Sequence, residues 1–201
     1  YFCELLDDEV RARFEESLER LRAAGATIVD THIPHAREIV PVYVTIVFAD
    51  AAAYHAPTLE TMPERYTAPV RARLEVGRYL LAEDYSRALR GRELLRDEVE
   101  RALGPHDALV LPTLPIPAPT LGAQTATLGG STEPVRNLML RLTQLFNLSG
   151  HPAISLPCGT TAQGLPCGLQ LVGRRTESLV QVALACEQTL RPRGEFGHWE
   201  I

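Results

Sequence analysis

The chain has 201 residues, of which 45% are hydrophobic and 22% are charged, with a formal net charge of −5. It is long enough to bury a real core, and its composition is typical of an ordinary soluble globular protein. The acidic balance offers no electrostatic footprint for phosphate backbones, so we expect no nucleic-acid partner. All 20 residues counted as Lys+Arg are arginine, which excludes from these residues any chemistry that needs the neutral amine of lysine.

Neither a membrane segment nor a secreted disulfide scaffold is predicted. The most apolar stretch, Val42 to Tyr54, is interrupted by Asp50 and is shorter than the about 20 residues that span a bilayer. No charged and then apolar leader opens the chain. The cysteines show no paired CxxC spacing and are Cys3, Cys158, Cys167 and Cys186. We therefore expect a cytoplasmic protein with no membrane partner, in which the thiols act as small buried hydrophobes.

The first predicted elements are a helix and a short strand. Acidic residues 7–9 favour a helix N-terminus, and Gly25 supplies a left-handed stop. Apolar residues recur between them at helical spacing, namely Val10, Phe14, Leu18 and Leu21. Residues 26–29 then predict a buried strand. A helix that feeds a strand is the second half of a β-α-β unit, so we expect the strand before it to lie outside these residues.

The middle of the chain predicts helices joined by loops. Residues 42–53 fit either a strand, because apolar residues alternate in the first half, or a helix, which residues 49–53 favour. Pro57, Pro63 and Pro69 predict loops and short turns. After Gly77 a long helix is predicted, ending at Gly104. Its apolar face comprises Leu81, Tyr85, Ala88, Leu95, Val99 and Ala102.

Residues 108–111 predict a buried strand that must stop at the prolines that follow it, because proline cannot donate to a sheet ladder. In α/β sheets the loops at the carboxyl ends of strands line the ligand crevice. Pro112 and Thr113 are therefore predicted to form a pocket wall.

The last third predicts a loop, two helices and two strands. Residues 121–134 are small and polar and indicate a mobile loop. A helix over 135–146, strands at 154–156 and 169–172 joined by residues 159–164, and a helix over 177–190 follow. The inner face of that helix is predicted to hold Leu179, Val180, Ala183, Leu184 and Cys186.

Three ordered stretches carry a resemblance to a known family: residues 77–85, residues 107–113, and the run from Thr143 to Gly173. This run contains TQLFNLSGHPAISLPCG and LPCGLQLVG, and with the other two it resembles the C-terminal part of the amidase signature family. That family hydrolyses or transfers amides with a catalytic serine, a second serine beside a cis peptide bond, and a lysine. The resemblance implies an α/β fold, a mixed β-sheet flanked by helices. It also implies that residues 1–201 are the C-terminal portion of a single amidase domain whose catalytic portion lies outside them.

The resemblance also implies a binding site but no catalytic residue within the chain. The stretch that matches the family at residues 143–152 lies against the substrate there, which adds Thr143, Asn147, Gly150 and His151 to the pocket wall. Asn147 has two donors and an acceptor for an amide, and Gly150 would let backbone approach a ligand closely. The structural alternatives are that Asn147 braces the loop and that Gly150 only turns the chain.

Other combinations of reactive residues are weaker. Ser131 follows two glycines, but Thr-Glu-Pro comes where the nucleophile loop of the family has a second serine, so we interpret it as a loop residue. A Ser-His-carboxylate triad lacks a Gly-x-Ser-x-Gly elbow. His32 and His35 are not accompanied by the His-Glu-x-x-His motif or the cysteine cluster that would supply the other ligands of a zinc site. Cys158 and Cys167 would face each other across the hairpin, and we interpret them as buried thiols rather than a bridge or half a metal site.

We expect the whole protein to hydrolyse a small-molecule carboxylic amide through an acyl-enzyme, without cofactor or metal. These residues would supply the pocket wall, with the N-terminal portion of the same polypeptide as partner, and would be inactive alone. Two alternatives stay open: the A-type subunit of a glutamine-dependent tRNA amidotransferase, and a non-catalytic α/β binding module. Leu140 and Arg141 stand near the position where those amidotransferases carry an acidic residue, which favours the amidase. A homodimer stays open, and apolar surface is expected to be exposed where the missing sheet would pack.

Overall fold

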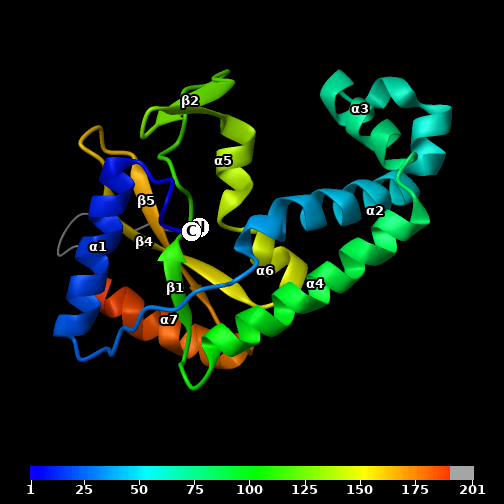
Figure 1. The fold of residues 1–201 in the computed structure, drawn as a ribbon. Helices are drawn as coiled ribbons and strands as arrows, with labels where there is room; N and C mark the ends of the chain where they lie inside the picture. The colour runs from blue at the N-terminus through cyan, green and yellow to red at the C-terminus, as the bar shows by residue number, and fades with distance from the viewer. Residues whose placement is uncertain (191–201) are drawn as a thin grey trace. The chain divides into compact units, whose positions relative to one another are not determined.

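The computed structural model describes residues 1–190, which divide into two compact units. The first unit contains residues 1–32 and the described residues from 100 onward, and the second contains residues 33–99. The helices and strands of both units are drawn in Figure 1.

The first unit is built on a three-stranded sheet in the order β1-β5-β4, formed by β1 (Leu109–Pro112), β4 (Ala153–Thr160) and β5 (Pro166–Val172). Both pairings are antiparallel. With its helices, this sheet confirms the α/β class, but the strands in the described residues form an antiparallel sheet rather than the mixed sheet that was expected. A register shift between Pro157 and Gly159 marks a β-bulge in β4.

Two helices cover one face of this sheet: α1 (Asp8–Ala23) and α7 (Thr176–Leu190) (Figure 1). Alternate residues of β4 and β5 point to these helices, as the pleat of a strand requires. The buried cluster comprises Val10, Phe14, Leu21, Leu156, Cys158, Cys167, Leu169, Leu171, Leu179, Ala183 and Leu190. This is the main core of the unit.

The predicted ends of α1 are confirmed. The Asp7 carboxylate accepts hydrogen bonds from the backbone N–H of Glu9 at 2.9 Å and of Val10 at 3.4 Å, which is ordinary N-capping. Gly25 follows the helix with a φ of 98°. The predicted strand at 26–29 is wrong for the described residues, because it forms no ladder with β1, β4 or β5, and a strand exists only with a partner.

The face predicted for α7 is partly wrong. Leu179 and Ala183 are buried, but Val180 and Leu184 are 43% and 54% exposed. They lie one position along from the buried pair, where a period of about 3.6 residues turns the side chain out of the core.

A two-stranded hairpin replaces the loop predicted at 121–134. Strands β2 (Thr125–Leu128) and β3 (Ser131–Pro134) pair antiparallel. Gly129 and Gly130, both at positive φ, form its two-residue turn, which matches the glycine preference of such turns. Leu128 packs with Ile116 and with Leu138 of α5 (Val135–Arg141). The helix predicted over 135–146 is in fact two, since α6 (Gln144–Ser149) begins after a break.

The second unit is helical. It contains η1 (Ala36–Glu38), α2 (Ile39–Thr61), η2 (Pro63–Arg65), α3 (Ala68–Gly77) and most of α4 (Ala82–Leu103). The helix favoured for residues 49–53 and the long helix ending at Gly104 are confirmed. The loops predicted around the prolines are partly wrong, because Pro57 lies inside α2 and Pro69 in the first turn of α3, a position that proline tolerates.

The helix from Ala36 to Thr61 corrects the expectation drawn from Val42 to Tyr54. By length and composition alone it could cross a membrane, and no other helix in the described residues could. Only the predicted length is corrected, because the helix extends beyond the apolar stretch on both sides; the absence of a membrane partner stays a prediction. An apolar helix of a soluble protein passes the same test, so this finding does not locate the protein.

Large apolar side chains are exposed mainly in the second unit, which has no strand among its described residues; exposed apolar surface where the missing sheet would pack stays a prediction. These side chains include Val40, Tyr54, Val70, Val76, Tyr79, Leu81 and Leu94. Leu81 is 57% exposed and precedes α4, so its predicted place on the buried face is wrong.

Candidate functional site

A pocket of about 380 Å³ lies beside the carboxyl end of β1 in the first unit. Its walls come from α1, the segment after β1, α5, and the β4–β5 hairpin. Most of the lining is apolar, including Val10, Leu114, Ile116, Met139 and Leu156. The volume lies within the range of roughly 300–1,000 Å³ that is usual for small-molecule sites.

Two hydroxyl groups supply the polar wall of the pocket. Thr113 Oγ1 and Ser155 Oγ are 2.7 Å apart, and both residues line the pocket together with Gly168. The backbone N–H of Thr113 donates to Gly168 O at 2.8 Å, extending the β1–β5 ladder by one residue. Ser155 pairs with Gln170 across β4 and β5, so the strand register places it on the face away from α1 and α7.

Gly168 allows the two hydroxyls to meet. A Cβ on this residue would lie 2.8 Å from both Ser155 Oγ and Thr113 Oγ1. A side chain at position 168 would therefore push the pair apart.

The predicted binding residues occupy two regions of the first unit. Thr113 lines the pocket, and Pro112 is fully buried at the end of β1. Thr143, Asn147 and Gly150 lie on or beside α6, outside the pocket lining. Substrate contact by them remains a prediction.

The α6 segment is held largely by its own backbone. Thr143 precedes the helix and donates through Oγ1 to Leu140 O at 3.3 Å. Asn147 and Gly150 are exposed, and Gly150 ends the helix at a φ of 73°, a left-handed conformation that suits glycine. The exposed amide of Asn147 is available to a ligand that reaches this face.

His151 braces this segment. It is 8% exposed, its Nδ1 lies 2.8 Å from Ser149 Oγ, and its Nε2 lies 3.0 Å from Glu100 Oε1. Arg174 Nε donates to the other oxygen of Glu100 at 2.9 Å. That guanidinium first, and His151 second, hold the pKa of Glu100 below its usual value, against a rise from burial.

The series Ser149, His151 and Glu100 has the composition of a catalytic triad, but its burial favours a structural role. Ser149 is only 2% exposed, so its hydroxyl has no access to a substrate. Both ring nitrogens of His151 are engaged, as they would also be in a triad, so the burial of Ser149 decides. We interpret the three as a hydrogen-bonded brace.

Comparison with known proteins identifies the family. Residues 1–178 match the family described as Amidase. The chain belongs to the amidase family.

The most similar sequences include an amidase and one component of an amidotransferase. An amidase from Pseudomonas putida is 37% identical over 166 residues, which cover 82% of this chain and 36% of that protein. The A-type subunit of the Glutamyl-tRNA(Gln) amidotransferase from Acidobacterium capsulatum is 33% identical over 214 residues, covering 93% of this chain and 44% of that protein. The chain therefore spans about two fifths of the length of these relatives.

A solved structure agrees with this assignment. A crystal structure of an amidase superposes with a TM-score of 0.83 at 36% identity, over 91% of this chain and 42% of that one. The amidase fold of these residues is thus shown by sequence and by structure.

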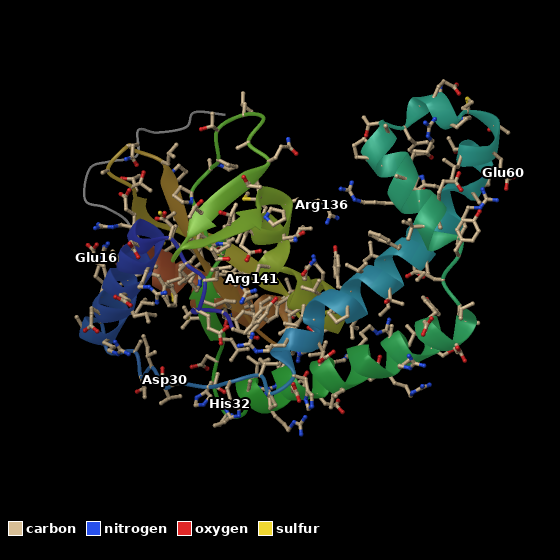
Figure 2. The ribbon with its side chains drawn as sticks, turned by 45° about the horizontal axis from the view of Figure 1, so that its top comes forward. Glu16, Asp30, His32, Glu60, Arg136 and Arg141 are labelled. Carbon is tan, nitrogen blue, oxygen red and sulfur yellow. The ribbon has the colours of Figure 1, made fainter. Side chains whose placement is uncertain are left out.

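Within residues 1–190, His32, His35 and Ser131 do not form a further site. His32 is exposed (Figure 2), and His35 Nδ1 lies 2.5 Å from Oε1 of the buried Glu98. Ser131 begins β3, and its hydroxyl donates to Glu133 Oε1 at 2.9 Å. Within the part of the chain that the structure describes, no three potential metal ligands gather.

The two hairpin cysteines are free and buried. Burial raises the pKa of Cys158 to about 11, and neighbouring Cys167 adds to the rise. Both belong to the core beneath α1 and α7, so they behave as the small hydrophobes that were expected.

Sequence reasoning missed Ser155, Gly168 and Met139 as pocket residues. The available signal was the alternation of β4, in which Ala153, Ser155 and Pro157 are exposed between buried or half-buried apolar residues. Alternation predicts which face of the strand Ser155 lies on. It does not predict which residue lies next to Ser155, because that depends on the pairing with β5.

Proposed function

We propose that the whole protein hydrolyses carboxylic amides through an acyl-enzyme and that the residues described here form part of its substrate pocket. Membership of the amidase family and 37% identity to an amidase support this proposal. The observation that carries it is the pocket beside β1, because a largely apolar cavity with two convergent hydroxyls has the character of a small-molecule site.

The catalytic chemistry is proposed to come from residues outside this sequence. These 201 residues contain no lysine, and the chain spans 36% of the amidase it matches. We therefore propose a serine nucleophile and its serine–lysine relay elsewhere in the polypeptide. The chain alone would bind without turnover, and no cofactor or metal enters this mechanism.

An amidotransferase component is the second candidate, because such a protein is 33% identical over 93% of the chain. The surroundings of Arg141 argue against it (Figure 2). Arg141 Nη2 donates to Tyr1 O at 3.0 Å, and its guanidinium lies 3.9 Å from the centre of the Tyr1 ring. This position thus holds a cation, which also lies 3.8 Å from Glu4 Oε2, whereas the resemblance implies an acidic residue near this position in the amidotransferases.

The two candidates are separated by turnover. The whole protein should release amine or ammonia from aryl and aliphatic amides faster than from glutamine, and residues 1–201 alone should release none. Glutaminase activity that rises with a charged tRNA would identify an amidotransferase. Ligand binding by the whole protein with no turnover of any amide would identify a binding module instead.

Location and assembly remain proposals. The unpaired spacing of the cysteines supports a cytoplasmic protein. A homodimer is tested by sedimentation of the whole protein.

A further inference from the structure

We infer that the pocket beside β1 selects uncharged, largely apolar amides, with the Thr113–Ser155 hydroxyl pair as its hydrogen-bonding point for the substrate. This inference rests on the proposed amidase function. It adds a substrate class and two specificity-determining residues, one of which, Ser155, the sequence did not indicate.

The charge of the lining is the first argument. The pocket is lined by apolar side chains, two hydroxyls, a glycine and the Cys167 thiol, with no acidic or basic side chain among them. A charged substrate group that enters such a site loses part of its hydration and gains no opposite charge from the lining, which is unfavourable. An uncharged ring or alkyl chain loses nothing by the same transfer and gains contacts with Leu114, Ile116 and Met139.

The proton count of the hydroxyl pair is the second argument. Each hydroxyl has one proton and two lone pairs, and at 2.7 Å one of the two donates to the other. The accepting hydroxyl keeps its proton, so the pair can donate one hydrogen bond to a ligand and can also accept. This suits one neutral carbonyl or amide group better than a carboxylate, which would require several donors.

The backbone at Gly168 fixes the pair in place. Gly168 O receives the Thr113 N–H at 2.8 Å, while the missing side chain of Gly168 leaves the room that both hydroxyls occupy. The hydroxyls therefore sit on a hydrogen-bonded ladder rather than on a free loop, which preorganises the contact.

The test measures kcat/KM of the whole protein on two matched pairs of amides that differ only in a carboxylate: benzamide with 4-carboxybenzamide, and acetanilide with 4-carboxyacetanilide. We expect the neutral member of at least one pair to be preferred 100-fold or more. Ser155→Ala and Thr113→Val should each lower kcat/KM for that member about tenfold, mainly through KM. Gly168→Ala should resemble a variant that carries both of these substitutions, because its methyl group would displace both hydroxyls.

A matched control is available in the β2–β3 hairpin. Thr127 and Thr132 also pair their hydroxyls, at 3.4 Å, but lie outside the pocket. Thr127→Val should therefore leave kcat/KM unchanged for all four amides. Met139→Arg adds a cation to the lining. It should therefore lower the ratio of kcat/KM for the neutral amide to kcat/KM for its carboxylated partner.

The outcomes separate the inference from the proposed function. Hydrolysis of charged and neutral members at similar rates would overturn the inference while leaving the amidase proposal intact. If no amide is hydrolysed, the amidase proposal fails. The inference is then decided by calorimetry, which compares the affinity of the whole protein for benzamide with its affinity for 4-carboxybenzamide. Preference for benzamide that is lost in Ser155→Ala supports it, and equal binding refutes it.

Discussion

The Arg174 side chain joins the end of α4 to the chain after β5, and its removal should measurably destabilise the first unit. Besides its bond to the Glu100 carboxylate, Arg174 Nη2 donates to Glu100 O at 3.0 Å and to Gly104 O at 2.8 Å. These carbonyls lie at the C-terminus of a helix, where a cation is favourable. Arg174→Met removes all three bonds and keeps most of the apolar stem.

The expected loss follows from the exposure of the groups. The Arg174 and Glu100 side chains are 39% and 43% exposed, so their ion pair should contribute only about 0.2–1 kcal/mol. Each bond to a backbone carbonyl adds roughly 0.5–1.5 kcal/mol. Because these groups stay partly hydrated in the variant, we expect a total loss of about 1–3 kcal/mol at pH 7, measured by urea denaturation with far-UV circular dichroism.

The pH dependence gives a second readout. Arg174 is the first cause of the lowered pKa of Glu100. A carboxyl group with a lowered folded pKa stabilises the protein above its unfolded pKa of about 4.3 and loses this contribution as pH falls through the folded value. The difference between wild type and Arg174→Met should therefore be complete at pH 7 and shrink below pH 4.

The neighbouring arginine is the control. Arg175 is 79% exposed and lies 3.7 Å from Glu177, which is 78% exposed. Arg175→Met should change stability by less than about 0.5 kcal/mol. Equal losses for the two variants, or a loss at position 174 that does not depend on pH, would refute the role assigned to Arg174.

Three further outcomes are expected. Leu169→Ala removes a fully buried side chain from the main core and should cost about 2–5 kcal/mol in urea denaturation; a loss below about 1 kcal/mol would contradict this packing. Gly77→Ala would bring a Cβ onto the Phe48 carbonyl oxygen, so it should lower the thermal stability of the second unit, although alanine is ordinarily the better helix former by about 1 kcal/mol. Burial raises the pKa of both Cys3 and Cys158, to about 11 in Cys158, but Cys3 is exposed and Cys158 is buried, so iodoacetamide at pH 8 should alkylate Cys3 sooner, as peptide mass spectrometry would show; equal rates would contradict the burial of Cys158.

Local signals in the sequence predicted the elements whose ends are chemically marked. Asp7 precedes α1 and Gly25 follows it, and Gly104 follows α4. Capping and glycine stops act within a few residues, so they can be read without knowledge of the fold. The β4–β5 hairpin followed in the same way from apolar runs separated by glycine, whereas the α/β class was implied by the resemblance to the amidase signature family.

Elements that depend on a partner were predicted less well. Residues 26–29 are apolar enough for a strand but form no ladder within the described residues. The β2–β3 hairpin, by contrast, is small and polar and was expected to be a loop. Its two-glycine turn resembles a nucleophile loop in sequence, although paired glycines are also a hairpin signal.

The pocket shows the same limit at the level of single residues. Thr113 was predicted because prolines end the strand before it, a local fact. Ser155 lies 42 positions further along the chain and reaches Thr113 only because β1 and β4 both pair with β5. A slip of one residue in the β4 register would turn Ser155 toward α1 and α7 and remove the hydroxyl pair. The substrate preference proposed for this protein thus depends on strand register, which the sequence of either strand alone does not contain.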